Sequence, residues 1–256
     1  MAPKKARRLV TMTTNVLDLI ETVLPHTDRI LLCGPPGVGK TYLATMSIRP
    51  GQSVYSITLT EDTPAAELRG HYVPTAGGNF LWQDGPVTTA RFRTPGARLV
   101  LNEIQHASAD ALSFLLVVLD DPATARLTLP TGETIQAQPN GQIIATMNGD
   151  PDSLPEAIRS RFPVTMTIDI PHPQALENLP PDLREAAAGT VGAGEHERRL
   201  DLRVWFAFAS LRTHVAEEIA AQAVFGHWAP EIMDALKLAR AAAEAPKAPK
   251  TATKRS

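Results

Sequence analysis

The sequence predicts an α/β fold in which a parallel sheet lies between layers of helices, followed by a small all-α domain. Short apolar strands alternate with helical segments as far as residue 170, which is the pattern of βαβ units in a parallel sheet. From Pro171 onward strand patterns cease, and 202–225 and 231–240 have helical spacing. At 256 residues the chain can bury a substantial core in one large or two modest domains.

The elements of this fold are expected in a regular order. Apolar residues at helical spacing predict a helix within 12–24, ended by Pro25. Apolar runs bounded by turn residues predict strands, at 29–33, 52–59, 98–104, 142–148 and 164–168. Helical spacing and capping residues predict further helices, at 42–46, from Pro86, at 108–119 and within 154–162. Turn residues between short extended segments predict two hairpins, near 70–83 and 125–138.

A glycine-rich loop follows the first strand and has the spacing G-x-x-x-x-G-K-T. Its residues are Gly34, Pro35, Pro36, Gly37, Val38, Gly39, Lys40 and Thr41. The glycines let successive backbone N–H groups turn toward phosphates, while Lys40 reaches the β- and γ-phosphate oxygens and the Thr41 hydroxyl coordinates Mg²⁺. The apolar strand before the loop and the helix after it are the context that this motif requires. The sequence therefore predicts binding of a nucleoside triphosphate with Mg²⁺.

Polar residues follow two of the later strands. Open α/β sheets bind ligands at the carboxyl ends of their strands, and Glu103 and Asn148 are both expected there. Glu103 is well placed to orient or deprotonate the water that attacks the γ-phosphate, and Asn148 to position that water. Arg159 and Arg161 lie in the short helical segment that follows. Either arginine could extend to stabilise the charge of the transition state.

Composition and charge exclude several classes of protein. No run approaches the ~20 apolar residues of a membrane span and no signal-peptide pattern is present, so we expect a cytoplasmic protein without a membrane partner. The net charge is −2, but basic residues gather in tails at 1–11 and 243–256, the second of which we expect to be disordered. Cys33 is the single cysteine and ends a core strand, which predicts a buried structural thiol.

The phosphate loop, the strand 99–104, Asn148 and the segment 154–162 together resemble the AAA+ ATPases, most closely their MoxR-like and dynein-related branch. The similarity covers about residues 12–240. It implies a three-layer P-loop NTPase core over 12–170 and a helical lid over 171–242. The hairpins near 70–83 and 125–138 look like the helix-2 insert and the pre-sensor hairpin of this branch, both facing the central pore or a client.

The resemblance also assigns roles to individual residues. It implies that Gly34–Thr41 is Walker A, with Tyr42 completing the nucleotide-binding set, and that Asn102 and Glu103 form Walker B. Asn148 corresponds to sensor 1, and Arg161 to an arginine finger that reaches a neighbouring subunit's nucleotide, with Arg159 as the second candidate. Arg203 looks like sensor 2, which contacts the γ-phosphate.

The activity implied by the resemblance is ATP hydrolysis, with Mg²⁺, at the interfaces of a homo-oligomeric ring. By family analogy we expect the ring to be a hexamer. Its expected function is to remodel a protein client or partner complex. MoxR-like ATPases commonly act with a von Willebrand factor A-domain protein, so such a partner is implied here. An arginine supplied by a neighbour means that the monomer should be nearly inactive.

One residue departs from the family pattern. Walker B strands usually end in Asp-Glu, whereas this strand ends in Asn102-Glu103. An asparagine still accepts a hydrogen bond from a water of the Mg²⁺ shell, but it brings no negative charge. Because Glu103 is retained, we expect slow hydrolysis rather than none.

Two other functions stay open at this stage. One is a nucleic-acid-directed motor that uses GTP or ATP, which the basic tails favour and which the lack of a basic stripe interleaved with aromatics in the core disfavours. The other is a nucleotide-gated assembly module with little hydrolysis, which Asn102 favours. The choice between ATP and GTP depends on a base pocket that no motif in the sequence defines.

Overall fold

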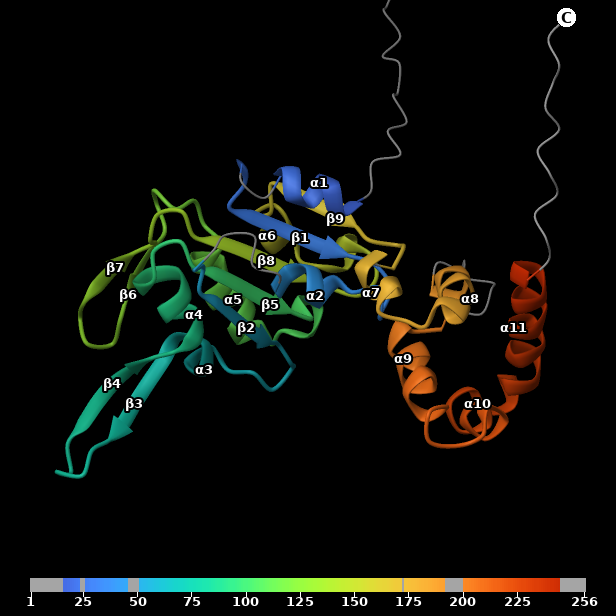
Figure 1. Ribbon diagram of the computed structural model, residues 1–256. Coiled ribbons are helices and arrows are strands. Elements are labelled where there is room, and N and C mark those ends of the chain that lie inside the picture. The colour runs from blue at the N-terminus through green and yellow to red at the C-terminus, as the bar shows by residue number, and fades with distance from the viewer. Residues whose placement is uncertain (1–15, 24–25, 46–50, 172, 192–199, 245–256) are drawn as a thin grey trace, which may run out of the picture. The chain divides into compact units, whose positions relative to one another are not determined.

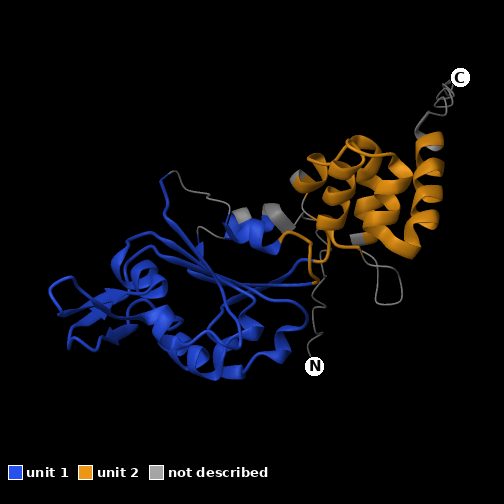
Figure 2. Ribbon diagram, turned by 90° about the horizontal axis from the view of Figure 1, so that it is seen from below, with its two compact units in different colours: residues 1–34, 40–168 blue, residues 35–39, 169–256 orange. Residues whose placement is uncertain are grey.

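The computed structural model describes residues 16–23, 26–45, 51–171, 173–191 and 200–244. These residues belong to two compact units (Figure 2): 1–34 with 40–168, and 35–39 with 169–256. The predicted tail over 1–11 and the part of the other predicted tail beyond residue 244 lie outside the described residues. Among the helices that are described, none has the length and apolar character needed to cross a bilayer.

A parallel sheet of five strands forms the centre of the first unit (Figure 1). Its order is β2-β5-β8-β1-β9. The strands are β1 (Arg29–Cys33), β2 (Val54–Thr58), β5 (Arg98–Asn102), β8 (Gln142–Thr146) and β9 (Val164–Thr167). Every residue of β5 and β8 is buried, as expected for central strands of a sheet covered on both faces. The predicted α/β fold class is confirmed.

Helices and short helical turns connect these strands. The helices are α1 (Val16–Val23), α2 (Lys40–Thr45), α3 (Ala65–Arg69), α4 (Pro86–Thr88), α5 (Ala109–Val118) and α6 (Glu156–Arg159). A π-helical turn (Thr89–Arg93) extends α4, and 3₁₀ turns cover Ile104–His106 and Pro151–Ser153. Ser108 caps α5, because its hydroxyl accepts a hydrogen bond from the backbone N–H of Ala111 at 3.0 Å. Ser108 is the first residue of the range 108–119 in which the sequence predicted a helix.

Two antiparallel hairpins project from the same side of the first unit (Figure 1). Their strands are β3 (Gly70–Pro74) with β4 (Phe80–Asp84), and β6 (Arg126–Thr128) with β7 (Thr134–Gln136). Phe80 and Leu81 are exposed on the first hairpin. Arg93 joins the two hairpins: its Nε donates to Asp84 Oδ2 at 2.8 Å, and its two Nη atoms donate to the two carboxylate oxygens of Glu133 at 2.7 Å.

Helices make up the described part of the second unit beyond residue 169. They are α7 (Pro173–Glu177), α8 (Pro181–Val191), α9 (Leu202–Leu211), α10 (Glu217–Phe225) and α11 (Ala229–Glu244), with a 3₁₀ turn at Gly226–Trp228. Trp205, Phe208 and Phe225 pack their rings together, with centroids 4.9–6.5 Å apart. Helical spacing over 202–225 predicted continuous helix, but the structure breaks it between α9 and α10. Residues 243 and 244 of the predicted tail belong to α11.

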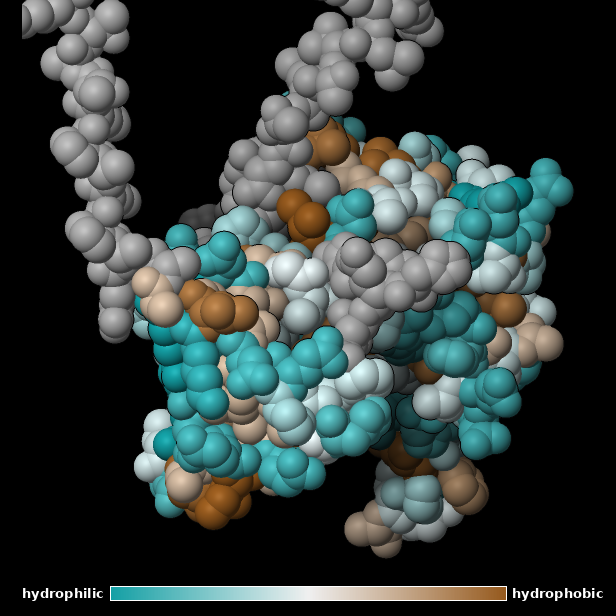
Figure 3. Space-filling view, turned by 90° about the vertical axis from the view of Figure 1, so that its right-hand side faces the viewer, coloured by the Kyte–Doolittle hydropathy of each residue, from teal (hydrophilic) through white to brown (hydrophobic). Residues whose placement is uncertain are grey.

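An ion-pair network ties the helices of the second unit together. Arg212 donates to both carboxylate oxygens of Asp182, at 2.7 and 2.8 Å. Arg240 on α11 donates to Asp182 at 2.6 Å and to Glu217 at 2.6 Å. Two arginines and two carboxylates thus join α8, the end of α9, α10 and α11. On the face drawn in Figure 3, small hydrophobic patches stand among mostly hydrophilic side chains.

We expect acidification to destabilise this helical unit. Hydrogen bonds from Arg212 and then Arg240 hold the pKa of Asp182 well below its usual range, and those from Arg240 lower the pKa of Glu217. A lowered folded-state pKa contributes stability that is present above the unfolded value, about 4, and is lost as pH falls toward the folded value. The melting temperature should therefore fall as the pH drops below about 5.

Thermal unfolding followed by circular dichroism between pH 7 and pH 3 measures this effect. Asp182→Asn should have a lower melting temperature at pH 7 and a flatter dependence on pH than wild type. Asp234→Asn is the matched control, because Asp234 is exposed and its ion pair with Lys237 is long, at 3.8 Å. If the melting temperature depended on pH equally in wild type and Asp182→Asn, the acid sensitivity would not come from the ion pairs of Asp182.

Candidate nucleotide-binding site

Lys40 is the buried cation of the predicted phosphate loop. It opens α2, and its side-chain Nζ donates hydrogen bonds to the Gly34 carbonyl at 2.9 Å and to Asn148 Oδ1 at 2.8 Å. Gly34 has φ 138°, and a Cβ atom there would lie 2.0 Å from the Ile168 carbonyl oxygen, so only glycine fits. The first unit thus fixes both ends of the loop, Gly34 and Lys40.

Asn148 connects Lys40 to the predicted catalytic acid. It follows β8, and while its Oδ1 accepts from Lys40, its Nδ2 donates to Glu103 Oε2 at 2.8 Å. Lys40 can only donate and a carboxylate can only accept, so these two neighbours fix the orientation of the amide. The structure therefore brings the predicted Lys40, Glu103 and Asn148 together at the carboxyl ends of β1, β5 and β8.

Glu103 has an unusual backbone conformation for its residue type. Its φ of 56° and ψ of 45° lie in the left-handed region, which costs free energy for a residue with a side chain. The backbone N–H of His106 donates to the Glu103 carbonyl at 2.9 Å and closes the turn. Gln105, within this turn, donates from Nε2 to Glu103 Oε2 at 2.5 Å. Gln105 is the member of the site that the sequence interpretation missed.

Asn102 is held on both sides of its amide. Its Nδ2 donates to Ser56 Oγ at 2.9 Å, and its Oδ1 accepts from Thr146 Oγ1 at 3.2 Å. The side chain is buried at the carboxyl end of β5. An aspartate of the same shape could accept from both hydroxyls, so the surrounding residues do not require the amide.

The donor set of the site suits Mg²⁺. The Thr41 hydroxyl, the Asn102 amide oxygen and the Glu103 carboxylate are hard oxygen donors, which this ion prefers together with water and phosphate oxygens. Within the described residues, no cluster of three or more His, Cys, Asp or Glu side chains could hold a metal by itself. The residues thus fit an ion that is bound mainly through the nucleotide and water.

Asn102→Asp is expected to lower the Mg²⁺ concentration for half-maximal nucleotide binding or turnover by about 10- to 100-fold, the usual effect of one outer-shell partner. The added carboxylate attracts the ion, whereas the hydrogen bonds from Ser56 and Thr146 keep the side chain in place. Mg²⁺ titrations of nucleotide binding measure the change. Asn140→Asp adds the same charge at an exposed turn and serves as the control. An unchanged Mg²⁺ dependence in Asn102→Asp would exclude this role.

Both predicted finger arginines make hydrogen bonds within their own chain. Arg161 donates to the Leu116 carbonyl from Nε at 3.0 Å and to the Ala157 carbonyl from Nη1 at 2.6 Å. It also lies 3.3 Å from an oxygen of Asp120, and its side chain is 28% exposed. Arg159, with a side chain 36% exposed, pairs with Asp152. Both arginine side chains are thus partly exposed on the first unit.

Arg203 belongs to the second unit, in the first turn of α9. Asp201 caps this helix, because its Oδ1 accepts from the Arg203 backbone N–H at 2.8 Å. The Arg203 side chain is 84% exposed, and its Nη1 lies 3.9 Å from Asp201 Oδ2. The role of Arg203 as sensor 2 stays a prediction. Tyr42 is exposed on α2, and its role in nucleotide binding is likewise a prediction.

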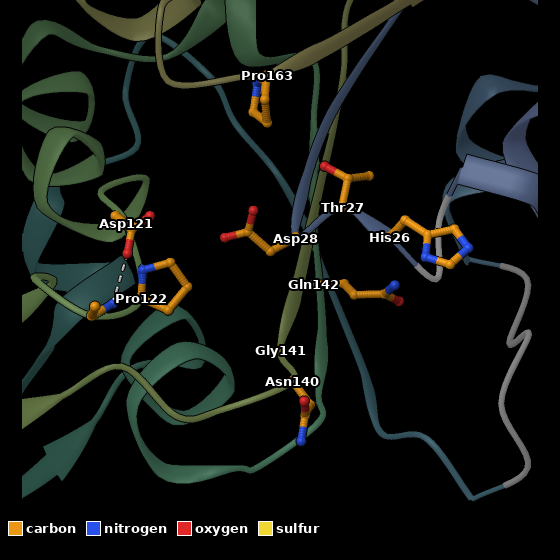
Figure 4. A pocket seen from close by; sticks show the side chains of 10 residues that line it. His26, Thr27, Asp28, Asp121, Pro122, Asn140, Gly141, Gln142 and Pro163 are labelled. Atoms are coloured by element: carbon orange, nitrogen blue, oxygen red, sulfur yellow. Dashed lines mark hydrogen bonds between the residues drawn. The ribbon is translucent and has the colours of Figure 1, made fainter.

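Two other features of the first unit take no part in these hydrogen bonds. Cys33 is fully buried, and burial raises the pKa of its thiol to about 11, as suits a structural residue. A pocket of about 620 Å³ lies where β1 and β8 begin, at the end of the sheet opposite to Glu103 and Asn148 (Figure 4). Asp28 and Asp121 are among its lining residues.

The fold and these contacts define a class of protein that sequence comparison confirms. A model of the AAA domain (dynein-related subfamily) matches residues 29–162, more than half of the chain. The chain therefore belongs to the AAA+ ATPase family, in its dynein-related, MoxR-like branch. Membership implies a nucleotide-binding fold for ATP, usually with Mg²⁺, and AAA+ proteins typically assemble into rings.

Particular relatives agree with this placement. Protein NorQ of Paracoccus denitrificans (strain Pd 1222) is 36% identical over 152 residues, which are 56% of this chain and 53% of NorQ. The chaperone protein ClpC4, chloroplastic, of Oryza sativa subsp. japonica is 32% identical over 132 residues, 46% of this chain and 13% of ClpC4. The chain thus spans about half the length of NorQ and much less of ClpC4.

Solved structures show the same fold. NtrX from Brucella abortus, in complex with ADP, superposes with a TM-score of 0.52 at 18% identity, over 78% of this chain and 50% of NtrX. A point mutant of RuvB from Thermotoga maritima gives 0.50 at 16% identity, over 86% of this chain and 67% of RuvB. At such low identities the likeness extends to the fold alone.

Proposed function

We propose that the protein hydrolyses ATP in a homo-oligomeric ring and uses nucleotide state to remodel a protein client or partner complex. The observation that carries the proposal is the hydrogen-bonded chain from Lys40 through Asn148 to Glu103. It joins the group that binds phosphate to the group that activates water, through the Asn148 side chain, which touches both.

Each residue has a role in the proposed reaction. Lys40 and the backbone N–H groups of the phosphate loop hold the β- and γ-phosphates. Glu103 accepts a proton from the attacking water, whose position Asn148 helps to define. Thr41 would hold Mg²⁺ directly and Asn102 would hold it through a bound water, and the ion would supply positive charge beside the phosphate oxygens. Arg161, with Arg159 as the second candidate, is supplied by a neighbouring subunit, and Arg203 contacts the γ-phosphate as sensor 2.

The assembly follows from the family and is part of the proposal. A hexameric ring would place the finger arginines at each interface, as the MoxR-like resemblance implies. The exposed Phe80 and Leu81 make the hairpin β3–β4 suited to contact a protein client. A von Willebrand factor A-domain protein is the proposed partner. We propose that the core, 12–170, and the lid, 171–242, are the two regions that move when the nucleotide state changes.

A second candidate function is a nucleotide-gated assembly module with little hydrolysis. Asn102 favours it, because the uncharged amide is already engaged by Ser56 and Thr146 and adds no negative charge for Mg²⁺. Such a module would bind ATP and assemble, but would release the nucleotide unhydrolysed. A nucleic-acid-directed motor has no support from the described residues of the core.

Turnover of ATP and GTP at increasing protein concentration tests the proposal. Turnover per protomer should rise cooperatively with concentration, as the ring forms. Lys40→Ala should weaken nucleotide binding by about 10- to 100-fold, because it removes a charged hydrogen-bond donor to phosphate. Lys237→Ala, at an exposed lysine of α11, should leave binding and turnover unchanged. ATP binding and assembly without turnover at any concentration would favour the assembly module instead.

A further inference from the structure

Gln105 contacts the proposed general base directly. Its Nε2 donates to Glu103 Oε2 at 2.5 Å, and Asn148 donates to the same oxygen at 2.8 Å. Both donors therefore occupy one carboxylate oxygen, which leaves the other, Oε1, on the opposite side of the carboxylate from these contacts. Since two donors on one oxygen restrict rotation of the carboxylate, they also determine where Oε1 lies.

The orientation of the Gln105 amide indicates that the hydrogen bond to Glu103 determines where the Gln105 side chain lies. Gln105 Oε1 is buried and has no hydrogen-bond partner among the described residues. Turning the amide over would bring that oxygen against the Glu103 carboxylate, so that two acceptors would face each other. The amide thus keeps its N–H groups on Glu103 although its own oxygen lacks a donor, which is unusual for a buried polar group.

The backbone of the turn is what brings Gln105 and Glu103 together. Glu103 is in the left-handed conformation, and the 3₁₀ turn Ile104–His106 follows it at once. Side chains two residues apart do not face each other on a regular helix, so the contact depends on this turn. A left-handed non-glycine residue at a functional position is typical of geometry that the surrounding contacts impose.

We propose that Gln105 is a positioning residue for hydrolysis: it fixes Glu103 through Oε2 so that Oε1 receives the proton of the attacking water. The inference rests on the proposed ATPase function. In the reaction the water oxygen bonds to the γ-phosphorus as the bond to the β,γ-bridging oxygen breaks, and that oxygen leaves with the electron pair on ADP. The proton goes to Glu103, and the products are ADP and phosphate. A neutral amide suits this task, because it orients the carboxylate without adding a charge.

Gln105→Met in the full-length, assembled protein tests the role. Methionine keeps a similar length and volume and removes the amide, whose N–H donates to Glu103 and whose oxygen has no hydrogen-bond partner among the described residues. We expect kcat to fall by about 10- to 100-fold, as misplaced catalytic groups do, while KM and the affinity for ADP stay unchanged. Gln105→Ala should behave alike, and it provides a second variant if either protein folds poorly. Gln222→Ala, at an exposed glutamine of α10, is the matched control with wild-type kcat.

The same substitution in a Glu103→Gln background separates positioning from a structural effect. If Gln105 acts through the Glu103 carboxylate, Gln105→Met should cause no further loss of the residual turnover there. An equal fold-loss in both backgrounds, or an unchanged kcat in Gln105→Met alone, would overturn the assignment while wild-type turnover stands. Lack of wild-type turnover at every concentration would instead overturn the proposed function, and the role of Gln105 with it.

Discussion

Arg161→Ala is expected to lower ATP turnover by about 10³- to 10⁵-fold, the range that arginine fingers contribute where they have been measured. The reason is that the guanidinium stabilises charge on the transferring phosphoryl group in the neighbouring subunit's site. The Arg161 guanidinium is held by the carbonyls of Leu116 and Ala157, and its side chain is 28% exposed. Arg159→Ala should have a smaller effect, because its pairing with Asp152 alone holds it less firmly.

Mixing two inactive variants distinguishes an arginine supplied by a neighbour from one that acts in its own subunit. Arg161→Ala protomers retain Glu103, and Glu103→Gln protomers retain Arg161, so mixed rings contain some complete sites. Turnover should therefore reappear on mixing, with a maximum at intermediate ratios. Arg184→Ala is the matched control, since Arg184 also donates to two backbone carbonyls but lies in the helical unit. A mixture as inactive as its components would show that Arg161 does not act across an interface.

Glu103→Gln is expected to lower turnover by about 10²- to 10⁴-fold, the usual contribution of a general base, without weakening ATP binding. A glutamine has nearly the same shape, and its one oxygen can accept the hydrogen bonds from Asn148 and Gln105, so the site should stay intact. It has no basic oxygen to take the proton of water. The variant should therefore accumulate as an ATP-bound assembly.

Single-turnover measurements with ATP, together with equilibrium binding, check this expectation. Glu61→Gln makes the same substitution at an exposed loop and should match wild type. If Glu103→Gln hydrolysed ATP as fast as wild type, the residual rate would belong to another group or a contaminant. Glu103 would then be a ligand-orienting residue rather than the base.

The sheet and the phosphate loop could be predicted because local sequence determines them. Residues 29–33, 98–102 and 142–146 are apolar enough to be buried on both faces, and each became a strand of the parallel sheet. The short helices α7 and α8 were missed, since prolines and small residues weaken the helical pattern there. Buried Leu183 and Ala187, spaced four residues apart, with buried Leu179 just before the helix, are the signal that could have revealed α8.

Within the site, the contacts that depend on backbone conformation could not be predicted from the sequence. Lys40, Glu103 and Asn148 were expected together because the carboxyl ends of parallel strands converge. The contact of Gln105 was not expected, because it requires the left-handed conformation of Glu103, and no residue pattern predicts that conformation. The bonds of Arg161 to Leu116 and Ala157 likewise depend on how α5 and α6 pack, which spacing alone does not specify.

Arg93 links the base of one hairpin, at the end of β4, to the connecting turn of the other, between β6 and β7. One guanidinium binds Asp84 at the end of β4 and Glu133 beside β7, so neither hairpin can tilt without breaking or stretching a hydrogen bond to the other. A load applied to β3–β4 would therefore be transmitted to β6–β7 through a single side chain. The two hairpins would then move together under a pulling force, although they are separate in the sequence and form separate sheets.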